Sequence, residues 1–149
     1  MHLKEILSRD EIEKTFGVLA QIYENLNKVT YIDDILNMMQ RGYRMAAVFE
    51  DQENNKCIGV VGIRIIRKLR FSKAVEIEDF MIDRNKRGIG VGKILLKWVD
   101  WQALNFKCDS IIGSLQTKRQ ESQRIFLREK FILEGYSLEK KINKINDKN

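Results

Sequence analysis

Arg87-Gly88-Ile89-Gly90-Val91-Gly92 is the stretch from which the rest of this chain can be interpreted. It follows an apolar segment with strand character and precedes a long amphipathic pattern typical of a helix. Glycine has no Cβ, so it adopts positive φ angles readily and lets a ligand come close to the backbone. Successive N–H groups and the amino end of the following helix then converge on an anion. The stretch therefore predicts a phosphate-binding loop, for which the pyrophosphate of a nucleotide-like cofactor is a natural ligand.

Two common glycine-rich loops do not fit this spacing. A Walker loop places four residues between its first glycine and the Gly-Lys pair, followed by Ser or Thr. Here three residues separate Gly88 from Gly92, and Ile94 follows Lys93. A dinucleotide-binding fingerprint would need a third glycine at the position of Lys93, and the loop does not follow the first strand of the chain as that fold requires. Both classes are excluded for this loop.

The loop and its surroundings resemble the acetyl-CoA-binding motif of the GNAT superfamily of N-acetyltransferases. The pattern is Arg-x-x-Gly-x-Gly, with Leu-Leu at 95–96 behind it and Glu-Asp-Phe-Met-Ile-Asp at 78–83 before it. Met-Gln-Arg-Gly-Tyr-Arg-Met at 39–45 resembles the helix end and the turn into the second strand of many members. Ser-Gln-Arg-Ile-Phe at 122–126 resembles the Ala-His-Arg-Phe-Tyr stretch of one branch. The resemblance thus covers nearly the whole chain.

This resemblance implies the fold class. We expect residues 1–149 to form a single α+β domain of the GNAT fold. Its central sheet would be mixed but mostly antiparallel, with six to seven strands splayed between the fourth and the fifth. About four helices would lie on the two faces of that sheet, an arrangement in which each element buries one apolar side.

Hydrophobic periodicity and turn signals predict a matching order of elements. Strands are expected over 1–7, 45–50, 57–66, 75–82 and 108–115, with one or two closing strands over 131–142. Helices are expected over 11–25, from Thr30 or Asp33 to the turn at Gly42, over 91–106 and over 118–129. Residues 51–56 form a polar turn and 67–73 a basic loop, and the end of the chain from about 145 is expected to fray.

Length and composition agree with one domain that can bury a core. The 149 residues hold 44% apolar side chains, and no apolar run approaches the length that crosses a bilayer. The first residues lack the layout of a signal peptide, so a cytoplasmic protein without membrane contact is expected. Cys57 and Cys108 are isolated, which predicts buried free thiols and no metal site.

The formal net charge of +6 raises the question of a nucleic-acid partner. Lysines are spread along the chain, and no basic run is interleaved with aromatic residues, so no nucleic-acid partner is expected. In the resembled fold the densest basic cluster lies near the adenosine 3′-phosphate of CoA. The cluster comprises Lys118, Arg119, Arg124, Arg128 and Lys130.

The activity implied by the resemblance is transfer of an acetyl group from acetyl-CoA to an amine acceptor. Backbone groups on the fourth strand would hold the pantetheine and the thioester, the glycine-rich loop would hold the pyrophosphate, and two later side chains would touch the cofactor. The cofactor-binding residues expected on this basis are Phe80, Met81, Ile82, Arg87, Gly88, Ile89, Gly90, Val91, Gly92, Lys93, Arg119 and Phe126.

A base is needed because a free amine with a pKa near 10 is almost wholly protonated at pH 7. Glu78 is the first candidate and Glu76 the second, since both lie on the same side of a strand. Two other interpretations stay open for Glu78. It could bind a cationic substrate without catalysing the reaction, or it could pair with Arg64 across the sheet.

Phe126 departs from the pattern of the family. Many members have a tyrosine here, whose hydroxyl lies near the CoA sulfur, whereas phenylalanine has no proton to donate. Gln123 replaces a histidine and Arg119 an asparagine of other members. These departures keep a second hypothesis open, in which the chain is a catalytically weak or inactive domain that binds acyl-CoA as a sensor.

The identity of the amine depends on segments that the motif does not determine. A small molecule and a peptide or protein amine both remain open. Five side chains are candidates to line an acceptor pocket, although each is individually more typical of surface or packing: Tyr23, Tyr31, Tyr43, Asp33 and Asp34. Exposed edge strands would allow a homodimer.

Overall fold

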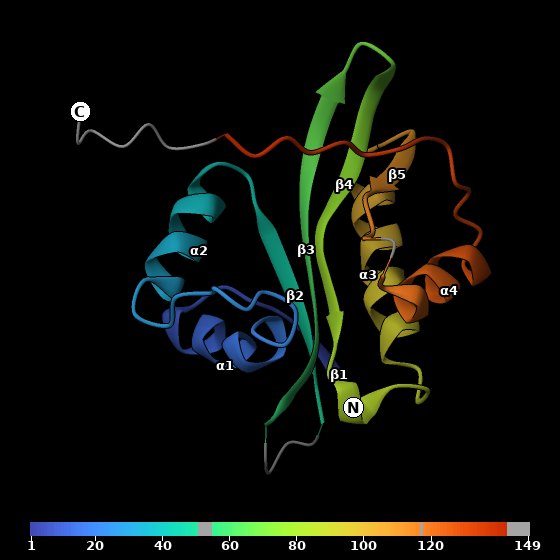
Figure 1. Ribbon diagram of the computed structural model, residues 1–149. Coiled ribbons are helices and arrows are strands. Elements are labelled where there is room, and N and C mark those ends of the chain that lie inside the picture. The colour runs from blue at the N-terminus through green and yellow to red at the C-terminus, as the bar shows by residue number, and fades with distance from the viewer. Residues whose placement is uncertain (51–54, 117, 143–149) are drawn as a thin grey trace.

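A five-stranded sheet in the order β1-β2-β3-β4-β5 forms the centre of the molecule (Figure 1). The strands span His2–Glu5, Arg44–Phe49, Cys57–Lys68, Phe71–Ile82 and Ser110–Gly113. The first four pair antiparallel, and β5 joins β4 in parallel. This computed structural model describes residues 1–50, 55–116 and 118–142, so most of the predicted polar turn and the predicted frayed end lie outside the described residues.

Helices cover both faces of this sheet, as the α+β prediction requires. In Figure 1, α1 (Arg9–Leu19) and α2 (Tyr31–Gln40) lie on one face, and α3 (Val91–Asn105) and α4 (Gln120–Arg128) on the other. A short 3-10 helix, η1 (Arg84–Lys86), precedes the glycine-rich loop. Each face has its own buried apolar cluster, one under α1 and α2 and one under α3 and α4. None of the helices in the described part is long and apolar enough to cross a membrane.

The helix predicted over 11–25 is shorter than expected at its carboxyl end. Ser8 caps α1, with its hydroxyl accepting from the Glu11 N–H while the Glu11 carboxylate accepts from the Ser8 N–H. The helix ends at Leu19, where the backbone tightens into hydrogen bonds between residues three apart. This turn brings Tyr23 toward β4, so the early end of α1 matters for the site described below.

The prediction of a basic loop over 67–73 is wrong. The β3–β4 ladder continues to Lys68 and Phe71, which leaves only a tight turn at Leu69 and Arg70. The basic side chains that suggested a loop are exposed on the end of a long hairpin. Because this part of the hairpin extends past the apolar core, charged residues are compatible with strand structure there (Figure 1).

The prediction of six to seven strands is also wrong, because 131–142 contribute no strand to the described part of the chain. Phe131 still packs against Phe126, with ring centroids 4.8 Å apart. The chain then runs past the tip of the β3–β4 hairpin, where Arg70 and Glu134 form an ion pair of 3.6 Å. The apolar residues that predicted closing strands are largely exposed along this path: Ile132, Leu133, Tyr136, Leu138 and Ile142. In this path they do not add a strand to β5.

A β-bulge interrupts the alternation of side chains along β4. Ile77 pairs with Ile63 and Asp79 with Gly62, so Glu78 is an extra residue with no Cα partner on β3. Val75 and Ile77 belong to the core under α3 and α4, and after the bulge Phe80 belongs to it as well. The extra residue therefore shifts the alternation of side chains, so that Phe80 faces the same side of the sheet as Val75 and Ile77.

The pKa of Glu11 provides a test of the α1 cap. Its hydrogen-bonded contact with Lys4 lowers this pKa from 4.5 to about 2, assisted by the donors at the helix start. A pKa that is lower in the folded state stabilises the fold above the unfolded value, and this contribution is lost as the pH falls from 4.5 toward 2.

We therefore expect Glu11→Gln to lower the melting temperature at pH 7 by about 2 °C, a modest effect because the pair is partly solvated. The difference from wild type should vanish near pH 2, as measured by thermal unfolding across pH. Glu13→Gln, at an exposed position of the same helix, is the matched control. An equal effect of both variants at every pH would contradict the assigned role of Glu11.

Candidate functional site

The glycines of the loop have two different structural roles. Gly88 and Gly90 have φ angles of +77° and +94°, in the region that favours glycine. Nothing lies within 4 Å of the position that a Cβ would take at either residue, so their backbone faces open space. Gly92 lies inside α3, where an added Cβ would be 3.1 Å from side-chain carbons of Ile82 and Ile125. The first two glycines shape the loop, and the third allows close packing.

Gly90 is also the N-cap of α3 and provides no side-chain acceptor for the helix. The first N–H groups of a helix have no carbonyl partner within it. In α3 these groups belong to Val91, Gly92 and Lys93, and the positive end of the helix dipole lies beside them. The amino end of α3 therefore offers several donors to an anion.

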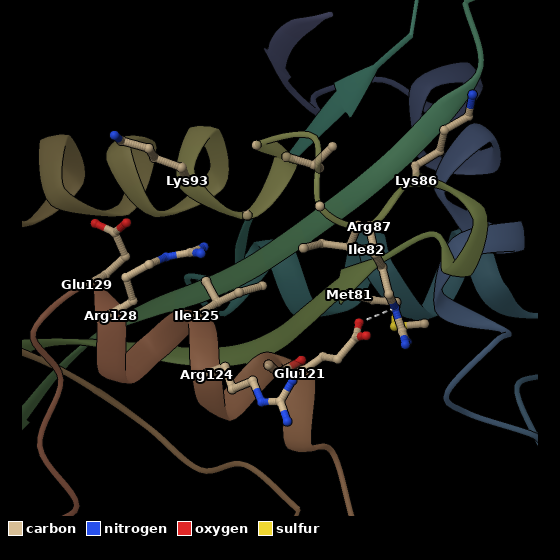
Figure 2. A pocket seen from close by; sticks show the side chains of 15 residues that line it. Met81, Ile82, Lys86, Arg87, Lys93, Glu121, Arg124, Ile125, Arg128 and Glu129 are labelled. Atoms are coloured by element: carbon tan, nitrogen blue, oxygen red, sulfur yellow. Dashed lines mark ion pairs between the residues drawn. The ribbon is translucent and has the colours of Figure 1, made fainter.

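A cavity of about 690 Å³ lies directly at this helix end. Figure 2 shows it between the loop and α3 on one side and α4 on the other. Its walls come from the end of β4, the loop, the start of α3 and one face of α4. The lining residues are Met81, Ile82, Lys86, Arg87, Gly88, Gly90, Val91, Gly92, Lys93, Glu121, Ser122, Arg124, Ile125, Arg128 and Glu129.

Cations outnumber carboxylates among the side chains that line this cavity. The five cations are Lys86, Arg87, Lys93, Arg124 and Arg128, against Glu121 and Glu129. Arg87 reaches from the loop to α4, where its Nε lies 2.9 Å from Glu121 Oε2 (Figure 2). This charge balance and the free helix end both favour an anionic ligand with several phosphates.

Eight of the residues predicted to bind the cofactor line this cavity: Met81, Ile82, Arg87, Gly88, Gly90, Val91, Gly92 and Lys93. Four others do not. Ile89 is half exposed on the outside of the loop. Phe80 and Phe126 are buried, with their rings packed edge to face and their centroids 4.9 Å apart. Arg119 lies next to β4 and is described below.

Most of the α4 wall was missed by the sequence prediction of site residues. Arg124 and Arg128 had been assigned only to a basic cluster, and Glu121, Ser122, Ile125 and Glu129 had no assigned role. Their positions recur every three or four residues, so one face of a helix presents them together. That spacing was the available signal. It could be recognised only once α4 was known to face the loop.

The pairing between β4 and β5 ends at Ile77 and Gly113. Among the described residues, no strand continues along this edge of β4 over 78–82. Arg119 occupies part of the edge, because its Nη2 donates to the Phe80 carbonyl oxygen and to Ser122 Oγ at 3.1 Å. Burial lowers the pKa of this guanidinium group. At the predicted splay between the fourth and fifth strands, β4 thus has an edge over 78–82 that β5 does not pair with.

Glu78, the extra residue of the bulge, is partly buried. Its Oε1 lies 3.5 Å from Arg64 Nε, so the predicted alternative of an ion pair across the sheet is confirmed. Burial raises the pKa of the Glu78 carboxyl above the ordinary value, while Arg64 acts in the opposite direction. Glu76 lies opposite Arg64 in the strand register and is also partly buried. Arg64 thus forms its ion pair with Glu78 and is the register partner of Glu76.

Asp79, next to Glu78, accepts two tyrosine hydroxyl groups. The Tyr23 hydroxyl donates to Oδ1 at 2.5 Å and the Tyr43 hydroxyl to Oδ2 at 2.6 Å. Burial is the main cause that raises the pKa of both tyrosines, and the Asp79 carboxylate adds to it. Asp79 was not predicted as a site residue, although it stands in the stretch that carries the family resemblance.

The other candidates for an acceptor pocket lie elsewhere. Tyr31 is buried, and its hydroxyl is 2.6 Å from Thr15 Oγ1. Asp33 pairs with Arg9 at 3.1 Å on the surface, and Asp34 accepts from the Thr30 hydroxyl. Of the five candidates, Tyr23 and Tyr43 are the two whose hydroxyl groups donate to β4, at Asp79.

Neither cysteine contributes to this site. Cys57 opens β3 as predicted, and burial raises the pKa of its thiol to about 12. Cys108 lies before β5 and is partly buried, and both thiols are free. Within the described ranges, no group of three or more His, Cys, Asp or Glu side chains could hold a metal ion.

The sequence of residues 10–131 matches the model of the acetyltransferase (GNAT) family. A search of curated protein sequences found no significant match.

Solved structures share the architecture over nearly the whole chain. A transcriptional regulator from Bacillus halodurans C-125 superposes with a TM-score of 0.82 at 15% identity, covering 95% of this chain and 100% of the other. An aminoglycoside N-acetyltransferase, AAC(6')-Iy, solved in complex with CoA, has a TM-score of 0.79 at 16% identity and 96% coverage of both chains. For glucosamine-6-phosphate N-acetyltransferase from Arabidopsis thaliana the TM-score is 0.77 at 16% identity, with 96% and 100% coverage. At these identities the likeness shows a shared fold.

The contact between Arg64 and Glu78 can be tested directly. Because Arg64 counteracts the effect of burial, Arg64→Met should raise the pKa of the Glu78 carboxyl further. The measurement is a pH titration of the ¹³C-labelled glutamate carboxyl resonances, assigned with Glu78→Gln. Arg67→Met, at an exposed position further along β3, is the control and should leave Glu78 unchanged. A Glu78 pKa that stays the same in Arg64→Met would show that the ion pair has no influence in solution.

Proposed function

This chain belongs to the acetyltransferase (GNAT) family, and we propose that it transfers an acetyl group from acetyl-CoA to a primary amine by direct attack on the thioester. The acceptor would be an amine of a small molecule or of a peptide or protein. One observation carries the proposal. The cationic cavity at the amino end of α3 leads to the unpaired edge of β4, beside which a partly buried carboxylate, Glu78, is located.

The residues present fit the chemistry of CoA. The free N–H groups at 91–93 suit a pyrophosphate, and Gly88 and Gly90 let it approach the backbone. Arg124 and Arg128 on the opposite wall suit a further phosphate group. Met81 and Ile82 continue the cavity along β4, where backbone groups could hold an extended amide-containing chain. When bound, acetyl-CoA supplies an activated acetyl thioester.

Glu78 is our first candidate for the base that removes a proton from the acceptor ammonium group, and Glu76 remains the second. Glu78 is three residues from Met81 along the strand, which corresponds to roughly 10 Å. For direct proton transfer the acceptor amine would have to reach along the strand toward Glu78, and otherwise its proton would pass through a chain of water molecules. The raised pKa of its carboxyl also brings it closer to the pH at which a base works best.

The departing thiolate finds no hydroxyl group at Phe126, whose ring is buried between Phe80 and Phe131. A thiol with a pKa near 8.5 can leave without a general acid, although more slowly. Arg119, which contacts the carbonyl oxygen of Phe80, is a cation close to this edge of β4. We therefore propose a transferase that works without a tyrosine acid.

The buried position of Phe126 also keeps the second function under consideration, a domain that binds acyl-CoA without catalysis. The two functions differ in a single assay. Purified protein is incubated with acetyl-CoA and a panel of polyamines, aminoglycosides, amino acids and short peptides, and thiol release is followed while binding is measured by calorimetry. Release with one acceptor class supports the transferase. Binding without release from any acceptor supports the sensor, and absence of binding contradicts both.

Replacement of the proposed base should affect turnover more than binding. We expect Glu78→Gln to lower kcat by a factor of about 100 to 10000, the usual contribution of general acid–base catalysis. The affinity for acetyl-CoA, measured by calorimetry, should change little, since Glu78 does not line the cavity. Glu76→Gln on the same strand is the matched comparison. If only Glu76→Gln loses turnover, the second candidate is the base; if neither does at saturating amine, both assignments are wrong.

Two lysines on α3 allow a controlled test of the cavity. Lys93 lines it, whereas Lys97, one turn further along, is exposed and does not. Lys93→Ala should weaken CoA binding about two- to fivefold at low salt, the scale of a solvent-exposed charge contact, and Lys97→Ala should leave it unchanged. The loss should diminish as salt screens the charges. Equal effects of the two variants would place the phosphates elsewhere.

A further inference from the structure

Asp79 directly follows the β4 bulge and accepts hydrogen bonds from two tyrosine hydroxyl groups. Tyr23 reaches it from the turn after α1, and Tyr43 from the turn between α2 and β2. Tyr43 is 2% exposed, so its hydroxyl has no access to bulk water and requires a protein acceptor. The Asp79 carboxylate is that acceptor, which links the layer of α1 and α2 to one residue of β4.

Gly62 makes this contact possible. It is the β3 partner of Asp79 in the strand register. A Cβ added to Gly62 would lie 1.7 Å from the Tyr43 hydroxyl oxygen and 2.3 Å from Cζ. Any side chain at this position would therefore displace the hydroxyl from Asp79. Glycine is needed at this position because it has no side chain, and not because of an unusual φ angle.

The same strand register contains the bulge. Gly62 pairs with Asp79 and the next residue, Ile63, pairs with Ile77, so Glu78 is the residue without a partner. A bulge of this kind needs a local cause, because an extra residue interrupts the ladder of hydrogen bonds. The two hydroxyl groups on Asp79 hold the residue that directly follows Glu78. They prevent β4 from shifting by one residue, which would move Glu78 and the apolar residues after it to other faces.

We infer that Tyr43, Asp79 and Gly62 form a lock that holds the β4 bulge and thereby positions Glu78 beside Arg64 for the transfer reaction. The inference rests on the proposed function in one respect, the assignment of Glu78 as the base. In this view Asp79 and Tyr43 are positioning residues. Tyr23 contributes a second, more exposed hydroxyl to the same carboxylate.

The groups that face Glu78 determine how its pKa changes when the lock is lost. They are Arg64 from β3, Glu76 and Asp79 from β4, and Tyr23 and Tyr43 from the helical layer. Burial is the largest cause that raises the pKa of the Glu78 carboxyl. A loosened bulge would admit water to this carboxyl, which lowers its pKa, and would move it away from Arg64, which raises its pKa. Because burial is the larger of the two causes, the net change should be a fall toward the ordinary value.

The kinetic test compares Tyr43→Phe with Tyr31→Phe. Each variant removes one buried hydroxyl group, but the Tyr31 hydroxyl is hydrogen-bonded to Thr15, whereas the Tyr43 hydroxyl donates to Asp79. We expect Tyr43→Phe to lower kcat by at least about tenfold, because small displacements of catalytic groups are costly. The KM for acetyl-CoA should stay within about twofold, since neither Tyr43 nor Asp79 lines the cavity, and the acid limb of kcat should move to lower pH. Tyr31→Phe should show neither change.

A spectroscopic test decides the inference without any turnover. The ¹³C carboxyl resonance of Glu78 is titrated in wild type, Tyr43→Phe and Tyr31→Phe. A midpoint that falls by about half a pH unit or more only in Tyr43→Phe supports the lock. An unchanged midpoint in Tyr43→Phe, or an equal fall in Tyr31→Phe, overturns it. If wild type releases no thiol with any acceptor, the proposed function fails while this titration still decides whether the lock exists.

Two further variants cover the case in which Tyr43→Phe does not fold. Tyr23→Phe removes the other hydroxyl from Asp79 at a partly exposed position, and it should lower the Glu78 midpoint by a smaller amount. Gly62→Ala should act like Tyr43→Phe, because the added methyl group displaces the hydroxyl. Gly17→Ala, at a glycine of α1 with open space around it, is the control for Gly62→Ala. Titrations of Tyr23→Phe and Gly62→Ala that both match wild type would overturn the lock.

Discussion

The site depends on a constraint on one strand, the limited pairing of β4. On its β3 side this strand forms a long ladder, but on its β5 side the ladder ends at Ile77 and Gly113. Backbone groups beyond that point need other partners, since unpaired polar groups in a protein interior are costly. Arg119 satisfies the carbonyl oxygen of Phe80, and the adjoining residues Met81 and Ile82 form a wall of the cavity. The end of the ladder is thus what makes an internal strand available to a ligand.

The bulge gives the same strand a second property. After Glu78 the apolar residues continue on the core face with a shifted phase, and Asp79 lies among residues of the helical layer formed by α1 and α2. One strand therefore forms part of the cationic cavity at its carboxyl end and of a charged cluster in its middle. That cluster combines the Arg64 cation with the carboxylates of Glu76, Glu78 and Asp79, and the charges of the other three groups all act on the pKa of Glu78. Because burial and neighbouring charges both shift a pKa, the Glu78 carboxyl is sensitive to small displacements within this cluster.

Two separate structural features of the cavity would favour an anion. The loop contributes backbone donors, which depend on positive φ at Gly88 and Gly90. The α4 helix contributes guanidinium groups, which depend on where the helix packs. Arg87 connects the two by its ion pair with Glu121, so the loop and α4 are linked even without a ligand. An entering anion would compete with Glu121 for Arg87. Because ion pairs at the surface are weak, Arg87 could exchange Glu121 for the anion.

The sequence by itself determined the features that depend on neighbouring residues. The spacing of glycines before an amphipathic run located the loop and the start of α3, and alternating apolar residues located the central strands. It also singled out Glu78, because a charged residue within an apolar strand is visible without a structure. Local rules suffice in these cases, since helix ends and strand alternation are set over a few residues.

Only the tertiary structure decided the number of strands, the α4 wall and the contacts of Asp79. The chain over 131–142 has apolar residues suited to strands, but strand formation needs a partner edge, and the chain takes another path. Tyr23 and Tyr43 lie 56 and 36 residues from Asp79 in sequence. No local pattern relates such distant positions, because the energy of a hydroxyl group on a carboxylate appears only when packing has brought them together.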